Sequence, residues 1–277
     1  MILLKKLILA PSFLIIFAIL ISQLNPLLKS YEFIFSLSLD TFIQLIVLSG
    51  LILLSSFSLV LFTALAFDWK IVLPVGLSGS LIPMIFVSQT LGLILSVGFL
   101  AVFLIIYLGV ENTLKNYLTF EPNSLFGPPI RHLASLLILV VSLTYFLSIS
   151  QVIQKQGFEI PDSLIESSLK LISQPQPEKT QNSPQPKLQI PPEQPPGDLL
   201  SDTVKQAIKD QLQNVLKPYL GIIPAILAVL LFLMLQSLMS ILNLMIHPVI
   251  WIMFYILEKS GFIKFTEEMR EVRKMVV

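Results

Sequence analysis

The chain has 277 residues, of which 55% are hydrophobic and only 13% are charged, and its formal net charge is +1. Soluble globular domains carry about 25% charged residues, so this composition excludes an ordinary soluble domain. The small net charge argues against nucleic-acid binding, and the absence of cysteine excludes a disulfide, a thiolate metal site and a cysteine nucleophile.

Long uncharged runs recur along the chain and predict an all-α fold, a polytopic transmembrane helix bundle of about six spans. A helix of about 20 apolar residues crosses the hydrocarbon core of a bilayer, which is about 30 Å thick. We place residues 1–150 in a membrane bundle of five spans, at residues 7–24, 41–67, 71–87, 91–110 and 133–150. The lysines before the first span also suit a signal peptide, but no small-residue cleavage site follows, which favours a retained anchor.

The third and fourth spans come from one uncharged run, residues 71–110. A single helix of that length would measure about 60 Å, twice the hydrocarbon thickness, so the run must cross twice. We place the turn at residues 88–90. The first half contains Pro74 and Pro83 together with two glycines, and this predicts a kinked or interrupted helix.

Small and hydroxyl residues recur at helical spacing on two spans. Ser49, Ser56 and Thr63 repeat every seven residues, and Gly92 and Ser96 lie four apart. In membranes such stripes allow close helix packing, so both faces are predicted to contact a neighbouring helix. Residues 111–132 are more polar and end in Gly-Pro-Pro, which predicts a loop.

The largest hydrophilic region, residues 151–218, is predicted to be an extracytoplasmic segment. Its residues 162–172 and 198–217 have apolar positions three or four apart, which predicts two amphipathic helices. Between them lies a linker rich in proline and glutamine, residues 175–196, which predicts an extended spacer. Apolar stripes on these helices could pair with each other or bind a protein partner.

The last apolar run, residues 219–257, is predicted to be a final span with an interfacial extension. We expect one crossing to about Ile246, and the remainder either continues that helix or lies along the membrane surface. Residues 258–277 follow as a cytoplasmic tail whose apolar stripe and opposite charges predict an amphipathic helix.

Lysine and arginine set the expected orientation. Six crossings place both termini on one side, together with most of the cations in short segments: Lys5, Lys6, Lys70, Lys115, Arg131 and five in the tail. Because short cytoplasmic segments carry an excess of these residues, we predict cytoplasmic N- and C-termini. The expected location is the cell membrane, meaning a plasma or inner membrane.

A polar seam runs along the final span. Gln236, Ser240, Asn243 and His247 follow one another at steps of four, three and four, which puts them on one helix face. Uncharged amides and an imidazole are costly against acyl chains, so this face should contact protein or line a cavity. We therefore take the seam as the candidate functional feature, either a packing contact or a polar pathway.

One short motif has a catalytic parallel. The tetrapeptide Gly76-Leu77-Ser78-Gly79 resembles the GxSG pattern of rhomboid intramembrane proteases, and the resemblance covers these four residues. It would imply Ser78 as a nucleophile with His247 as its base. Helix packing explains the same small residues. We assign no catalytic, cofactor-binding or metal-binding residue, and interpret His132 as a span-boundary residue.

These patterns favour a non-enzymatic membrane protein that anchors or organises other components. A transport or channel component is the alternative. The predicted spans contain no acidic or basic residue at mid-depth, which argues against a transporter of ions and restricts this alternative to a neutral or lipid-like solute. The expected partners are the lipid bilayer, a protein bound by the extracytoplasmic helices and a second copy of the chain. We expect no nucleic-acid partner and no cofactor.

Overall fold

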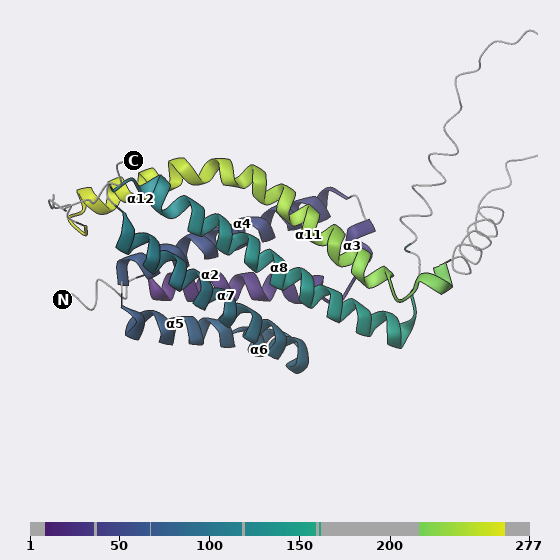
Figure 1. Cartoon of the computed structure of the whole chain (residues 1–277). Coiled ribbons are helices and arrows are strands. Elements are labelled where there is room, and N and C mark those ends of the chain that lie inside the picture. The colour runs from purple at the N-terminus through teal and green to yellow at the C-terminus, as the bar shows by residue number, and fades with distance from the viewer. Residues whose placement is uncertain are drawn as a thin grey trace, which may run out of the picture.

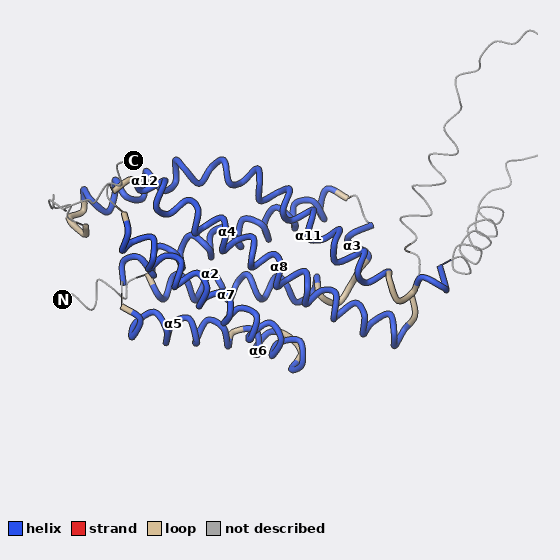
Figure 2. Tube along the Cα trace, in the orientation of Figure 1, coloured by secondary structure: helices blue, strands red, loops and turns tan. Residues whose placement is uncertain are grey.

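The fold is described here from a computed structural model, which covers residues 9–35, 38–66, 68–117, 120–158, 161 and 216–263. Helices connected by short loops make up these ranges, and no strand occurs within them (Figure 2). The predicted amphipathic helix at residues 162–172, the linker, residues 198–215 of the second predicted amphipathic helix and residues 264–277 of the tail lie outside the described residues. So do Lys5 and Lys6.

Within the described ranges, six helical segments are long and apolar enough to cross a membrane. The prediction of an all-α bundle of about six spans is therefore confirmed, and the chain is a multi-pass membrane protein. The segments are α2 (Ala10–Leu27), α4 (Leu39–Ala66), α5 with α6 (Trp69–Leu81, Pro83–Phe86), α7 (Gln89–Asn116), α8 (Pro122–Gln156), and α11 with α12 (Ile223–Leu242, Ile246–Lys259). Short elements join them: α3 (Glu32–Phe35), η1 (Lys217–Tyr219) and η2 (Asn243–Met245).

An aromatic cluster fills the space between α2 and α7. Phe17 lies edge-on to Phe99 at a centroid distance of 5.1 Å, and Phe13 lies edge-on to Phe103 at 5.6 Å. Both α2 rings are completely buried. Edge-to-face pairs of this kind are favourable beyond the area they bury, so this cluster holds the first span against the fourth.

Small residues let the helices approach one another as the sequence predicts. Ser49, Ser56 and Thr63 are all buried, and the last two donate to the carbonyls one turn before them, Ile52 and Leu59. A Cβ added at Gly92 would lie 3.0 Å from the Pro83 carbonyl oxygen, so α6 packs directly on the start of α7. The break predicted around Pro83 is also present, because α5 ends at Leu81 and α6 begins at Pro83.

The predicted loop over residues 111–132 is wrong. Helix α7 continues to Asn116, and α8 begins at Pro122 and passes through Pro128 and Pro129. Those two prolines lack the N–H groups that would bond the carbonyls one turn back, which usually ends a helix. Here Phe126, in the same turn, stacks on Phe254 of α12 at 4.9 Å, and this tertiary contact supports the helix. The fifth span is accordingly longer than residues 133–150.

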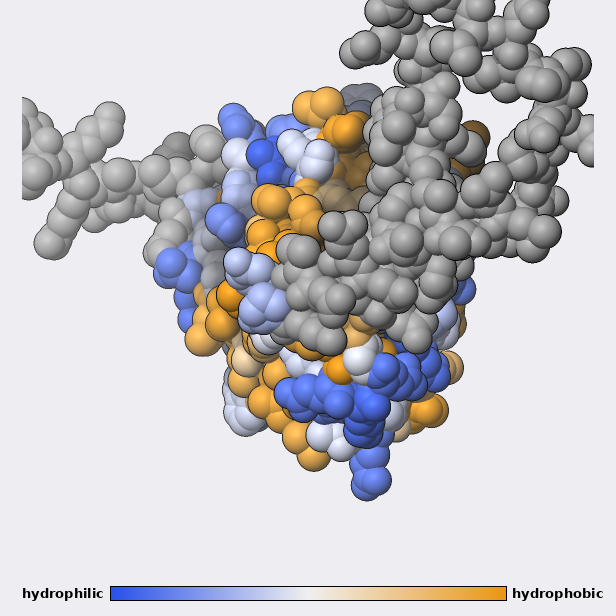
Figure 3. All heavy atoms as spheres, turned by 90° about the vertical axis from the view of Figure 1, so that its right-hand side faces the viewer, coloured by the Kyte–Doolittle hydropathy of each residue, from blue (hydrophilic) through white to orange (hydrophobic). Residues whose placement is uncertain are grey.

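The beginning of α2 and the end of α12 lie at the same end of the bundle (Figure 1). The other end holds the last turns of α8 and the start of α11, which are the helices on either side of residues 159–215. Seen from that end, hydrophilic surface lies beside apolar surface on the described residues (Figure 3). The fold thus places both helices that flank the hydrophilic segment at one end, opposite the two described chain ends.

Candidate functional site: the polar contact of α8 with α11 and α12

The polar seam of the last span meets polar residues of α8. Helices α8 and α11 pack against each other and run in opposite directions (Figure 1). The Nε2 amide of Gln236 donates a hydrogen bond to the hydroxyl of Ser135 at 3.3 Å, and both side chains are half-buried. Because a membrane offers no water to these groups, the bond ties the two helices together at that depth.

The second contact of the seam joins two residues that lie 116 positions apart in the chain. The Nη2 of Arg131 lies 2.8 Å from the Nε2 of His247. A guanidinium only donates hydrogen bonds, so His247 accepts here, and its Nε2 carries no proton in this arrangement. Both side chains are exposed, which places this contact at the surface of the helix pair.

The other two seam residues, Asn243 and Ser240, differ in burial. Asn243 is half-buried, and its Oδ1 has no hydrogen-bond partner among the described residues. The Oε1 of Gln236 also has none. Ser240 is exposed. At about 100° per residue, Ser240 lies about 40° from Gln236 and about 60° from Asn243 around the helix axis, which puts it at the outer edge of the stripe.

The GxSG tetrapeptide lies in α5, at the opposite side of the bundle from α12 (Figure 1). The hydroxyl of Ser78 donates to the carbonyl of Pro74 at 2.8 Å, and His247 bonds Arg131. A Cβ added at Gly79 would lie 3.0 Å from the Phe13 ring, so this glycine makes room for α2. The structure therefore does not bring Ser78 and His247 together, and the motif serves helix packing.

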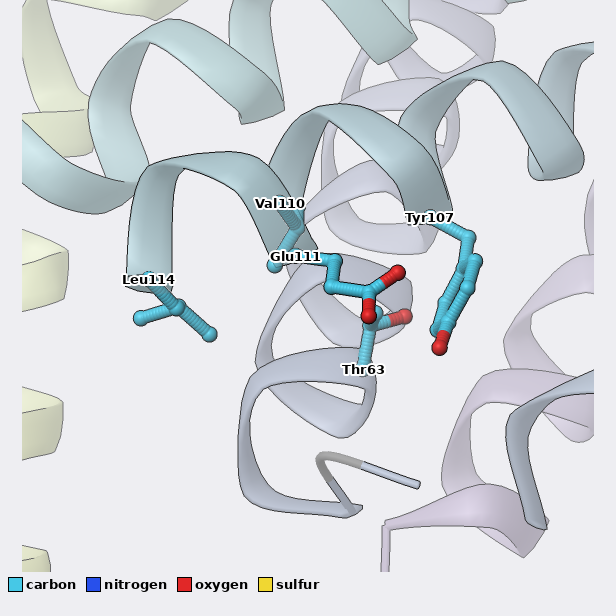
Figure 4. Close-up of a pocket in the computed structure, with 5 residues that line it drawn as sticks. All are labelled: Thr63, Tyr107, Val110, Glu111 and Leu114. Atoms are coloured by element: carbon cyan, nitrogen blue, oxygen red, sulfur yellow. The ribbon is translucent and has the colours of Figure 1, made fainter. Parts of the chain in front are cut away.

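Sequence reasoning missed a small hollow between α4 and α7. Thr63, Tyr107, Val110, Glu111 and Leu114 line it, and the Glu111 carboxylate points toward the hydroxyls of Thr63 and Tyr107 (Figure 4). The spacing of Tyr107, Glu111 and Lys115 by four residues could have revealed it. Lys115 donates to Glu111 at 2.6 Å, so the carboxylate is already paired. Its cavity volume, about 10 Å³, is far below the 300–1,000 Å³ usual for ligand pockets.

Within the described ranges, no three His, Asp or Glu side chains gather closely enough to hold a metal ion. No protein-family model, curated protein or solved structure matches the chain. The physical arrangement of these residues is therefore the basis for the proposals that follow.

Proposed function

We propose that this protein is a non-enzymatic membrane platform that holds the hydrophilic segment, residues 159–215, at the outer face of a plasma or inner membrane. Its partner is a protein that binds the two amphipathic helices predicted in that segment. The observation that carries the proposal is the fixed pairing of α8 with α11, since these are the two helices that enter and leave the segment.

The end of α8 is fastened to the loop after α2. Ser148 donates to the carbonyl of Leu28 at 2.6 Å, and the Tyr145 hydroxyl donates to the carbonyl of Ser30 at 3.4 Å. Gly157 follows the helix with a positive φ of 79°, which glycine adopts readily, and Phe158 then packs on Tyr31 at a ring-centroid distance of 5.2 Å. These contacts fix the direction in which the chain leaves the bundle.

The filled core of the bundle supports a platform more than a pathway. Aromatic side chains occupy the space between α2 and α7, and two of the four seam residues, Gln236 and His247, bond α8. Proteins that carry ions through a membrane usually place acidic or basic side chains inside their spans. The alternative of a transport component for a neutral or lipid-like solute has no specific support from these contacts.

The outward placement of the segment follows from the distribution of cations. Lys70 lies in the first turn of α5, Lys115 in the last turn of α7 and Arg131 in the third turn of α8, all toward the end of the bundle that also holds both described chain ends. Short cytoplasmic segments are enriched in such residues, so that end should face the cytoplasm. The segment at the other end would then be extracytoplasmic.

Cross-linking in intact membranes tests the proposal. The apolar stripe of residues 198–217 is converted to serine at Leu200, Val204 and Ile208. The matched control carries serine at Lys205, Lys209 and Gln213, which lie off that stripe. If the platform binds a partner through the stripe, the cross-linked protein disappears in the first variant and persists in the control. An unchanged cross-linking pattern in both variants rejects the proposal.

A further inference from the structure

Arg131 has unused hydrogen-bonding capacity at the surface of the bundle. Among the described residues its one hydrogen bond goes to His247, and it forms no ion pair. A guanidinium carries five N–H donors, so the other four have no partner within the described part of the chain. Exposed arginines commonly pair with carboxylates, and here the neighbour is an imidazole, so no described residue compensates the positive charge.

The pair also lies where polar and apolar surface meet. On α8, the segment from Leu133 onward is uncharged as far as Lys155. On the other helix, Leu244 lies one turn before His247, and its side chain is 76% exposed. An exposed cation whose histidine partner follows a large exposed apolar side chain matches a ligand with an anionic head and hydrocarbon tails.

The guanidinium is also sterically accessible. The atom nearest to a Cβ added at Gly127 would be Nη2 of Arg131, at 3.7 Å, and nothing else would lie within 4 Å. Glycine at this position therefore leaves open space on one side of the cation. The imidazole of His247 borders it on another side, with a second ring nitrogen that no group among residues 9–158 and 216–263, where described, bonds.

We propose that Arg131 and His247 bind the phosphate of an anionic phospholipid in the leaflet at the α12 end of the bundle. The planar guanidinium would donate two parallel N–H bonds to phosphate oxygens, a geometry that lysine lacks. The imidazole would donate a further bond from its free ring nitrogen, and the acyl chains would lie along the exposed side chains of η2. The bound lipid would link α8 to α12 and supply the negative charge that no described residue places beside Arg131.

Native mass spectrometry of the full-length protein tests the site. The protein is released from detergent micelles that contain equal amounts of phosphatidylglycerol and phosphatidylcholine. The wild-type protein should retain more phosphatidylglycerol than phosphatidylcholine. Arg131→Gln should reduce that preference about tenfold, as expected for loss of a charge-assisted contact. Lys70→Gln removes one cation at the same end of the bundle, away from the pair, and should leave the preference unchanged.

Two further variants make the test independent of folding. Arg131→Lys keeps the positive charge but loses the planar guanidinium with its two parallel N–H donors, and His247→Gln keeps a polar side chain. Both should weaken the lipid preference while melting at the wild-type temperature in phosphatidylcholine. The proposal is overturned if Arg131→Gln keeps the wild-type lipid preference. It is also overturned if Arg131→Lys and His247→Gln both keep it. An equal loss in Lys70→Gln also overturns it, because general surface charge would then explain the binding.

A second arm separates a lipid from a free anion. Inorganic phosphate at millimolar concentration is added in place of phosphatidylglycerol, and the melting temperature is measured. We expect phosphatidylglycerol to raise it and phosphate to have no effect. A rise of the same size with phosphate alone, lost in Arg131→Gln, would overturn the assignment to a lipid.

Discussion

Phe126 of α8 and Phe254 of α12 stack with their ring centroids 4.9 Å apart and their planes 15° from parallel. Phe120 completes the cluster, with its centroid 5.5 Å from that of Phe254. These contacts show where the apolar run of residues 219–257 goes after α11, because α12 continues beyond α11 and packs along the first turns of α8. The last two apolar helices together span 37 residues, about 55 Å, so part of them must tilt or extend beyond a hydrocarbon core of about 30 Å.

Phe254→Ala should therefore detach α12. The ring is almost fully buried, and removing a buried phenylalanine costs about 3–5 kcal/mol in soluble proteins. We expect a clear drop in the melting temperature of the protein in detergent. Ile252→Ala, on the exposed side of the same helix, should melt close to wild type. A melting curve for Phe254→Ala that matches the Ile252→Ala curve would show that this cluster contributes little.

Much of the fold could be predicted from the lengths of the uncharged runs in the sequence. The run over residues 71–110 had to turn once, and the structure turns it between Phe86 and Gln89. Hydroxyl and glycine stripes indicated which faces are buried, because small side chains at helical spacing have a direct meaning in membranes. Local patterns of this kind need no knowledge of which helices are neighbours.

The candidate site depended on such knowledge. Gln236 and His247 could be assigned to one face from their spacing, but their partner residues, Ser135 and Arg131, lie on another helix. No pattern in the sequence brings His247 to Arg131. The helical start of α8 was missed for the same reason, because Pro128 and Pro129 argue locally for a loop and the supporting contact comes from α12.

Gly98→Ala should loosen the packing of α7 on α8. A Cβ at this position would lie 2.8 Å from Cγ1 of Val140, closer than real atoms approach. Overpacking of this kind costs about 1–3 kcal/mol. We expect a lower melting temperature for Gly98→Ala and recovery on adding Val140→Ala. Gly109→Ala is the control, since nothing lies within 4 Å of its added Cβ. Failure of the second substitution to rescue the first would place the strain elsewhere.

The bond from Gln236 to Ser135 should contribute a small, measurable coupling. In a double-mutant cycle of Gln236→Leu and Ser135→Ala, we expect about 0.6 kcal/mol, the average for such bonds between membrane helices. Ser240→Ala replaces Ser135→Ala in the control cycle, because Ser240 is exposed and lies at the edge of the seam. Equal coupling in the two cycles would mean that the 3.3 Å contact does not join the helices. A solute flux abolished by Gln236→Leu, in protein that still melts normally, would favour the transport alternative.

The orientation of the bundle can be tested directly because the chain contains no cysteine. Gln156→Cys places a single thiol at the end of α8, and Ser260→Cys places one just after α12. The excess of lysine and arginine at the α12 end predicts that a membrane-impermeant maleimide labels Gln156→Cys on intact cells. Ser260→Cys should be labelled only after the membrane is opened. Leu137→Cys, buried in α8, should resist labelling in both conditions. The reverse pattern would place residues 159–215 in the cytoplasm and remove the basis for an external partner. Labelling of both Gln156→Cys and Ser260→Cys on intact cells would mean that α11 and α12 do not cross the membrane.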